Sequence, residues 1–101
     1  MYKMQSEGGT PQDVQIPVAI LGCGLIGISW AALFLHHGIN VRAWDPNPAA
    51  RNGLSEKVKA PMAQLAHMGP SPVTLGSLSV FTEMSAALEG VLFVQESAPE
   101  V

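Results

Sequence analysis

The sequence has little charge, a single cysteine and no long hydrophobic run, and each of these shortages excludes a class of protein. Charged residues make up 13% of the 101 residues and the formal net charge is −3, so we expect no nucleic-acid partner. Cys23 alone cannot form an internal disulfide framework. The longest apolar stretch, Leu25 to Leu35, is about half of the roughly 20 residues that span a membrane. We therefore expect a cytoplasmic protein without a membrane partner.

The chain divides into a polar start and one apolar domain. Residues 1–15 lack the apolar core of a secretory signal and offer nothing to bury, so we expect a disordered leader there. Residues 16–101 are enough for one small domain. Hydrophobic residues make up 48% of the chain, which is rich for a soluble domain of this size. This indicates apolar faces that pack against further sequence, so we expect a truncated domain.

Short apolar runs alternate with helical patterns along this domain. The pattern predicts strands at Val18–Leu21, Ile39–Trp44, Leu78–Phe81 and Val91–Val94. It predicts helices at Leu25–His37, from Pro48 to about Met68, and at Met84–Glu89. Continuous apolar strands that alternate with helices are typical of a parallel sheet with right-handed crossovers. The expected fold class is α/β, a Rossmann-type parallel sheet that is incomplete, with about four strands and crossover helices.

Two of these helices carry specific expectations. The helix at Leu25–His37 is apolar around most of its circumference, which predicts that it is largely buried. The next helix begins well, because Asn47 is a good N-cap and Pro48 a good first helical residue. Pro61 interrupts its apolar face, and since proline removes one backbone hydrogen bond we expect a kink or a split there.

A glycine-rich turn of the form GxGxxG follows the first strand and opens the first helix. Gly22 permits the tight turn, Gly24 lets the backbone approach a pyrophosphate, and Gly27 lets the helix pack closely on the strand. The amides at the helix start, including those of Leu25 and Ile26, would then face the anion, which the helix dipole favours. A glycine turn alone is weak evidence, but its place between a strand and a helix makes it specific.

Asp45 ends the second predicted strand, 18 residues after Gly27. A carboxylate at this place accepts hydrogen bonds from the hydroxyls of the adenosine ribose, and it would repel a 2′-phosphate. The cofactor is therefore predicted to be NAD rather than NADP. Arg51 is the nearest positive side chain, and we interpret it as a solvated helix residue. The alternative is a parallel-sheet protein with a glycine turn and a chance aspartate.

No metal site or reactive group is predicted. Cys23 lies near a helix N-terminus, which could lower the pKa of its thiol, but a small residue that fills a tight turn is the simpler interpretation. His36 and His37 are adjacent on a helix and point in different directions. No cysteine or carboxylate has zinc-site spacing to them.

From about Pro17 to Val101 the sequence resembles the NAD-binding domain of the 3-hydroxyacyl-CoA dehydrogenase family. Within the family it is most similar to the branch of L-carnitine dehydrogenase, lambda-crystallin and L-gulonate 3-dehydrogenase. The resemblance rests on the glycine turn, on Ala43-Trp44-Asp45-Pro46, and on Gln95-Glu96-Ser97-Ala98-Pro99-Glu100. Flavin-binding domains share the glycine turn but not the last of these segments, and more often have Glu in place of Asp45.

The resemblance implies an oxidoreductase of fatty acid metabolism that oxidises a 3-hydroxyl to a 3-keto group and passes hydride to NAD. Its substrate would be of the hydroxyacyl-CoA or L-carnitine type. Ser97 is implied beside the nicotinamide side of the cofactor, and Glu100 near the nicotinamide ribose. The family's catalytic histidine and glutamate, its substrate domain and its homodimer interface lie downstream, so no catalytic residue is expected here and a small-molecule substrate would bind only the full-length enzyme. The alternative is a non-catalytic nucleotide-binding or crystallin-like structural protein.

Overall fold

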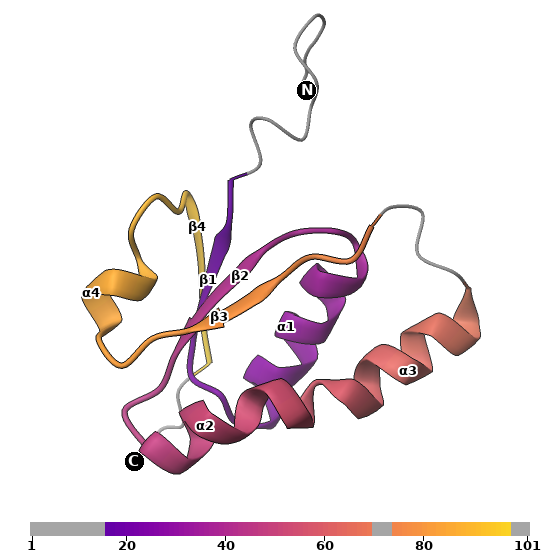
Figure 1. Cartoon of the computed structure of the whole chain (residues 1–101), viewed down its shortest axis with the longest axis horizontal. Coiled ribbons are helices and arrows are strands. Elements are labelled where there is room, and N and C mark those ends of the chain that lie inside the picture. The colour runs from indigo at the N-terminus through magenta and orange to yellow at the C-terminus, as the bar shows by residue number, and fades with distance from the viewer. Residues whose placement is uncertain (1–15, 70–73, 98–101) are drawn as a thin grey trace, which may run out of the picture.

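A computed structural model describes residues 16–69 and 74–97 of the chain (Figure 1). The expected leader, residues 1–15, and Glu100 lie outside the described residues. The elements follow in the order β1 (Val18–Leu21), α1 (Leu25–His36), β2 (Val41–Trp44), α2 (Pro48–Lys57), α3 (Lys59–Met68), β3 (Leu78–Val80), α4 (Met84–Ala87) and β4 (Phe93–Glu96). This alternation confirms the predicted α/β fold class.

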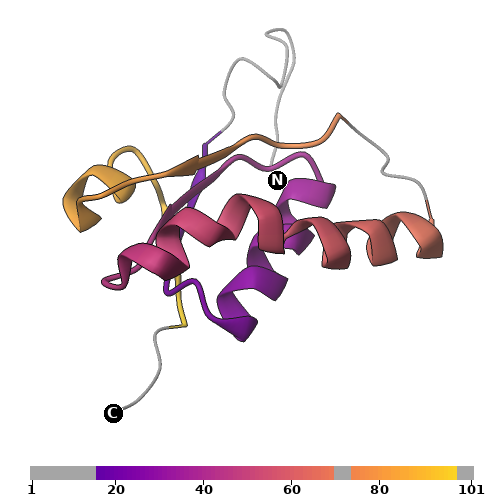
Figure 2. The ribbon, with the colours of Figure 1, turned by 60° about the horizontal axis from the view of Figure 1, so that its bottom comes forward.

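The four strands form one parallel sheet in the order β3-β2-β1-β4. The chain runs outward from β1 through β2 to β3, and then returns to place β4 on the other side of β1. Helices α1, α2 and α3 lie on one face of this sheet (Figure 2). The strand order therefore reverses between β1 and β4, and in open α/β sheets ligands bind at the carboxyl ends of the strands at such a point.

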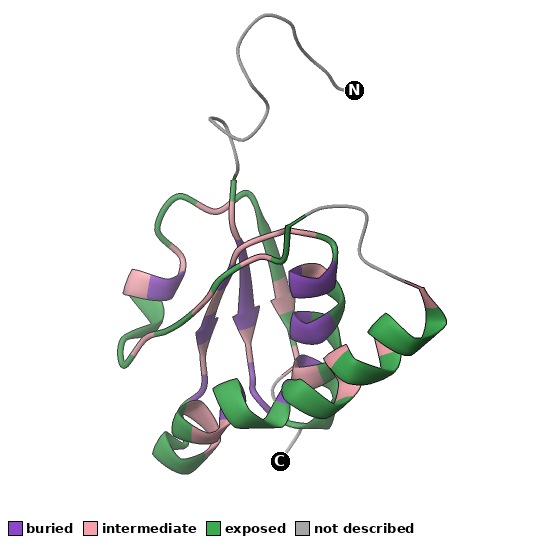
Figure 3. Cartoon of the chain, turned by 45° about the vertical axis from the view of Figure 1, so that its right-hand side comes forward, coloured by how far each residue is buried: buried purple, intermediate pink, exposed green. Residues whose placement is uncertain are grey.

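The core lies between β1, β2 and α1 (Figure 3). Strand β1 has a neighbour on each side, so Ala19 and Ile20 are fully buried. Ala31 and Leu35 cover the sheet from α1, and Leu54 reaches the same core from α2. The apolar run of β1 fits this position, because its successive residues Ala19 and Ile20 point to opposite faces of the sheet and both are fully buried.

Strand limits differ from the prediction where pairing sets them. The fourth strand was expected at Val91–Val94, but β4 begins at Phe93 and continues to Glu96, in register with the four residues of β1. In the same way β2 begins at Val41 opposite Val18, although the predicted strand starts at Ile39. The predicted burial of the fourth apolar run is wrong, because β4 lies at the edge of the sheet and its Phe93 and Val94 are 48% and 41% exposed. The hydrogen-bonding partner, and not the apolar pattern, decides where a strand starts.

The second predicted helix is split, as expected, but the break lies before the proline. Helix α2 ends at Lys57 and α3 begins at Lys59, with Val58 between them. Pro61 is then in the first turn of α3, where its missing N–H is not needed. The predicted cap is confirmed, because Oδ1 of Asn47 accepts a hydrogen bond from the amide of Ala49 at 2.8 Å.

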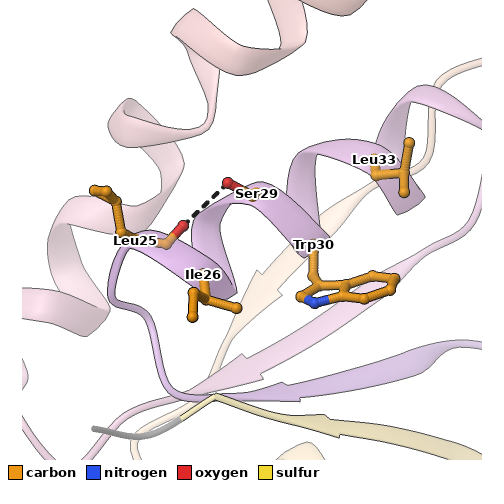
Figure 4. A pocket seen from close by; sticks show the side chains of 5 residues that line it. All are labelled: Leu25, Ile26, Ser29, Trp30 and Leu33. Carbon is orange, nitrogen blue, oxygen red and sulfur yellow. Dashed lines mark hydrogen bonds between the residues drawn. The ribbon is translucent and has the colours of Figure 1, made fainter.

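The prediction that the first helix is largely buried is wrong. Helix α1 buries the face that contacts the sheet and α3, but Leu25 and Ile26 are 76% and 63% exposed. These two residues line a shallow apolar pocket along α1, together with Ser29, Trp30 and Leu33 (Figure 4). The described part of the chain has no element over this face, because the sheet ends at β4.

Arg42 holds the short helix α4 against the sheet. Its guanidinium donates hydrogen bonds to the carbonyl oxygens of Ala86 at 2.8 Å and Ala87 at 3.3 Å. The same group lies over the ring of Phe81, 4.3 Å from its centroid. A positive group stabilises the carbonyl end of a helix, and the carbonyl oxygens and the aromatic ring in turn satisfy the half-buried guanidinium of β2.

Replacing Leu54 by alanine should lower the free energy of unfolding by about 2–5 kcal/mol, because it leaves a cavity in a fully buried part of the core. Urea unfolding followed by circular dichroism measures this change. Leu92→Ala is the matched control, since Leu92 is 83% exposed and its loss should change stability by at most about 0.5 kcal/mol. Equal effects of the two substitutions would contradict the assigned core.

Candidate functional site

The glycine turn after β1 is built by a close approach of backbone to backbone. Gly22 has a φ of 109°, a left-handed conformation that glycine adopts without strain. Its amide donates to the carbonyl oxygen of Trp44 at 2.8 Å, which ties the turn to the end of β2. A Cβ atom at Gly27 would overlap the carbonyl oxygen of Gly22. The first turn of α1 therefore lies directly against the end of β1.

The start of α1 presents backbone amides that no side chain caps. Gly24 is the N-cap residue, and it makes no side-chain capping bond. The first turn, which includes Leu25 and Ile26, contains no acidic residue. A Cβ atom at Gly24 would meet nothing within 4 Å, so the space in front of this turn is open. Uncapped amides at the positive end of a helix dipole form an anion-binding site.

Asp45 joins this turn to the start of α2. It is 5% exposed, and both of its carboxylate oxygens accept backbone hydrogen bonds. Oδ2 accepts from the amide of Cys23 at 2.6 Å, and Oδ1 accepts from the amide of Asn47 at 2.8 Å. Each carboxylate oxygen has a second acceptor position, so the group retains capacity for ribose hydroxyls.

The bridging role of Asp45 was not part of the sequence interpretation. The bond to Asn47 could have been found, because an aspartate often accepts from the amide two residues further on in a turn. The bond to Cys23 joins residues 22 positions apart and carries no local signal. It depends on the pairing of β1 with β2, which brings the two turns together.

Arg51 differs from the solvated helix residue that the sequence suggested. It is half-buried in α2, and its Nη1 donates a hydrogen bond to the carbonyl oxygen of Asp45 at 3.0 Å. The guanidinium therefore lies at the same turn as the carboxylate. Together the two residues place one negative and one positive group at the carboxyl end of β2.

Cys23 is buried and its thiol is kept neutral. Burial, and to a smaller extent the charge of Asp45, raise its pKa from 9.0 to about 11, and the opposing effect of Arg51 is smaller. The thiol is the reactive species only after it loses its proton. The structure therefore favours the simpler interpretation of Cys23 as a small residue filling a tight turn.

Ser97 lies where β4 ends, beside the glycine turn. Its amide donates to the carbonyl oxygen of Leu21 at 2.7 Å, and its Oγ is 3.4 Å from Nε2 of Gln95. Leu21 precedes the glycine turn directly, so Ser97 stands at the point where the strand order reverses. Its proposed partner at the nicotinamide ribose, Glu100, lies outside the described residues.

The described ranges contain neither a metal-binding cluster nor a membrane-spanning helix. Residues 16–69 and 74–97 contain no cluster of three or more His, Cys, Asp or Glu side chains that could hold a metal ion. None of the helices in these ranges has both the length and the apolar character to cross a membrane. The arrangement of amides and carboxylate around the carboxyl ends of β1 and β2 fits a dinucleotide, whose pyrophosphate and ribose need those two groups.

Comparison with known proteins gives the same assignment. The 3-hydroxyacyl-CoA dehydrogenase, NAD binding domain, matches residues 17–101. The chain is 40% identical over 92 residues to the L-carnitine dehydrogenase of Nocardiopsis dassonvillei, covering 90% of this chain and 28% of that protein. It is 35% identical over 89 residues to the lambda-crystallin of Oryctolagus cuniculus, covering 82% of this chain and 28% of that protein.

A longer relative shows the same partial coverage. The L-carnitine dehydrogenase/betainyl-CoA thioesterase of Ruegeria pomeroyi is 37% identical over 83 residues, which cover 81% of this chain and 17% of that protein. The chain therefore spans between 17% and 28% of the length of these three relatives.

Gly24→Ala and Gly27→Ala should separate the two roles of the glycine turn. Gly24 has an ordinary φ of −83° and open space at its Cβ position, so alanine there should change stability by at most about 0.5 kcal/mol. Its methyl group should still weaken NAD binding at least about tenfold, because it stands where the pyrophosphate approaches. Gly27→Ala should lose both stability and binding. Thermal unfolding and NAD titration calorimetry measure the two effects, and unchanged NAD affinity in Gly24→Ala would contradict the assignment.

The thiol of Cys23 should react slowly with iodoacetamide in the native protein. With a pKa of about 11 instead of 9.0, its thiolate fraction at neutral pH is roughly a hundredfold lower than in the unfolded chain. Alkylation rates followed by mass spectrometry, with and without urea, test this. Equal rates in the two states would show that the thiol is not protected.

The raised pKa also gives stability a defined pH dependence. The folded state favours the neutral thiol, so this contribution is complete below about pH 9 and is lost as the pH rises from 9.0 to about 11. Cys23→Ala should therefore flatten the alkaline decline of the melting temperature across that window. An unchanged decline would assign it to other groups.

Proposed function

The chain belongs to the family of 3-hydroxyacyl-CoA dehydrogenase NAD-binding domains, and from this we propose that it serves an enzyme that oxidises a 3-hydroxyl group to a 3-keto group. NAD is the cofactor of this domain. The observation that carries the proposal is the uncapped amide turn of α1 joined to the Asp45 carboxylate, in a chain 40% identical to an L-carnitine dehydrogenase. The substrate class follows from the relatives, and the coenzyme site from the geometry.

The residues of this chain would bind and orient the coenzyme. The amides of Leu25, Ile26 and Gly27 would hold the pyrophosphate, and Asp45 would accept from the adenosine ribose hydroxyls. Ser97 would lie on the nicotinamide side, because it stands beside β1 at the other edge of the turn. When bound, NAD supplies the acceptor for the hydride that leaves the substrate carbon.

We propose L-carnitine as the substrate, with a 3-hydroxyacyl-CoA as the next choice. Both carry a hydroxyl on carbon 3, counted from the carboxyl or thioester carbon as carbon 1, and L-carnitine dehydrogenases of several bacteria resemble this chain. The groups that hold the substrate and take its hydroxyl proton would come from the portion of the protein that corresponds to the rest of those relatives. We further propose that the whole protein is a cytoplasmic homodimer.

A second candidate function is a structural or purely nucleotide-binding protein. The similarity to lambda-crystallin is the specific observation that favours it. In this case the NAD site would persist while turnover would be absent. The two candidates therefore differ in catalysis and agree in coenzyme binding.

The test compares NADH production by the whole protein with L-carnitine, 3-hydroxybutyryl-CoA and L-gulonate. We expect turnover with L-carnitine to be fastest, and we expect the 101-residue chain to bind NAD without producing NADH. Coenzyme binding to both proteins is measured by calorimetry as the control. Binding without turnover of any of the three substrates would reject the dehydrogenase proposal and support the structural role.

A further inference from the structure

Arg51 contacts the backbone of Asp45, the proposed ribose acceptor, and has more hydrogen-bond donors than this contact uses. Its Nη1 donates to the carbonyl oxygen of Asp45 at 3.0 Å, and this fixes the guanidinium at the turn between β2 and α2. A guanidinium carries five N–H donors in a planar fork that matches phosphate geometry. Among the described residues, this carbonyl oxygen accepts one of the five.

The charges of Asp45 and Arg51 act on the same small region. Both charges act on the thiol of Cys23: the charge of Asp45 raises its pKa, and the charge of Arg51 lowers it. Cys23 also donates its amide to Oδ2 of Asp45, so both charges lie near the junction of the glycine turn with the end of β2. In the proposed site the adenosine ribose lies at this junction.

We propose that Arg51 is a second determinant of coenzyme specificity. Its cation is held beside the 2′-position of the adenosine ribose, where it attracts a 2′-phosphate. In the wild type the repulsion by Asp45 outweighs this attraction. This inference rests on the proposed NAD site. NAD has a hydroxyl at the 2′-position, which the carboxylate accepts, whereas NADP has a phosphate there, which the carboxylate repels and a guanidinium binds. The preference for NAD is then a balance between two opposite charges, and not a property of Asp45 alone.

The proposal is tested by a double-mutant cycle on the full chain, with NAD and NADP affinities measured by calorimetry. Asp45→Asn removes the negative charge and keeps an oxygen that can accept one of the two backbone amides. Arg51→Gln removes the positive charge and keeps an N–H donor for the carbonyl oxygen of Asp45. The wild type, both single variants and the double variant are compared.

The expected results follow from the charge balance. Asp45→Asn should weaken NAD binding about tenfold and strengthen NADP binding about tenfold, because a charge-assisted contact is gained or lost in each case. The double variant should lose the gain in NADP affinity. Asp45→Asn combined with Arg51→Lys should keep most of it. In the Asp45→Asn background, an NADP affinity that is equal with arginine and with glutamine at position 51 would overturn the proposal.

A matched control separates a local charge from the net charge. Lys57→Gln removes one positive charge from the exposed last turn of α2, away from the turn that holds Asp45. In the Asp45→Asn background it should leave the NADP affinity within about twofold. A loss as large as that caused by Arg51→Gln would show that NADP responds to net charge, and the proposal would fail.

The cycle also distinguishes this proposal from the NAD site on which it rests. Circular dichroism and thermal unfolding establish that each variant is folded. A folded wild type that binds neither coenzyme rejects both the site and the role of Arg51. If Asp45→Asn does not fold, Arg51→Gln alone decides. It should weaken NADP binding at least about fivefold and leave NAD within about twofold, and equal weakening of both coenzymes overturns the role.

Discussion

The carboxylate of Asp45 holds the site together, because it joins two turns that are distant in the sequence. It accepts the amide of Cys23 from the glycine turn and the amide of Asn47 from the start of α2. A buried carboxylate is stable in a protein when hydrogen-bond donors satisfy it, and here two backbone amides do so. The position of the uncapped amides at the start of α1 and that of the proposed ribose acceptor therefore depend on the same group.

The sheet makes this bridge possible. Strands β1 and β2 are parallel neighbours, so their carboxyl ends, and the turns that follow them, lie side by side. Gly27 packs against the carbonyl of Gly22 with no room for a side chain, which keeps the start of α1 close to the end of β1. On the other side of β1, β4 brings Ser97 to the same edge. The proposed coenzyme site thus draws its residues from the carboxyl ends of β1, β2 and β4.

The most specific parts of the site could be predicted from the sequence because their signals are local. Gly22, Gly24 and Gly27 follow a buried strand at fixed spacing, and Asp45 ends the next strand. The cap at Asn47 and the break near Pro61 were predictable for the same reason, since helix ends depend on neighbouring residues. The burial of α1 was not predictable. Its composition is apolar all round, but exposure of Leu25 and Ile26 depends on which elements lie over them.

The sequence by itself determined the order of strands and helices along the chain, the glycine turn, and which residues are proposed to bind the coenzyme. These features depend on hydrophobic periodicity and backbone conformation, which act over a few residues. Only the tertiary structure decided that Asp45 bridges to Cys23, that Arg51 turns back to the carbonyl of Asp45, and that β4 pairs with β1 from Phe93 onward. The first and third of these contacts join segments that are distant in the sequence, so the pairing of the strands fixes them. The second spans only six residues, but it depends on the conformation of the turn between β2 and α2 and not on a residue pattern.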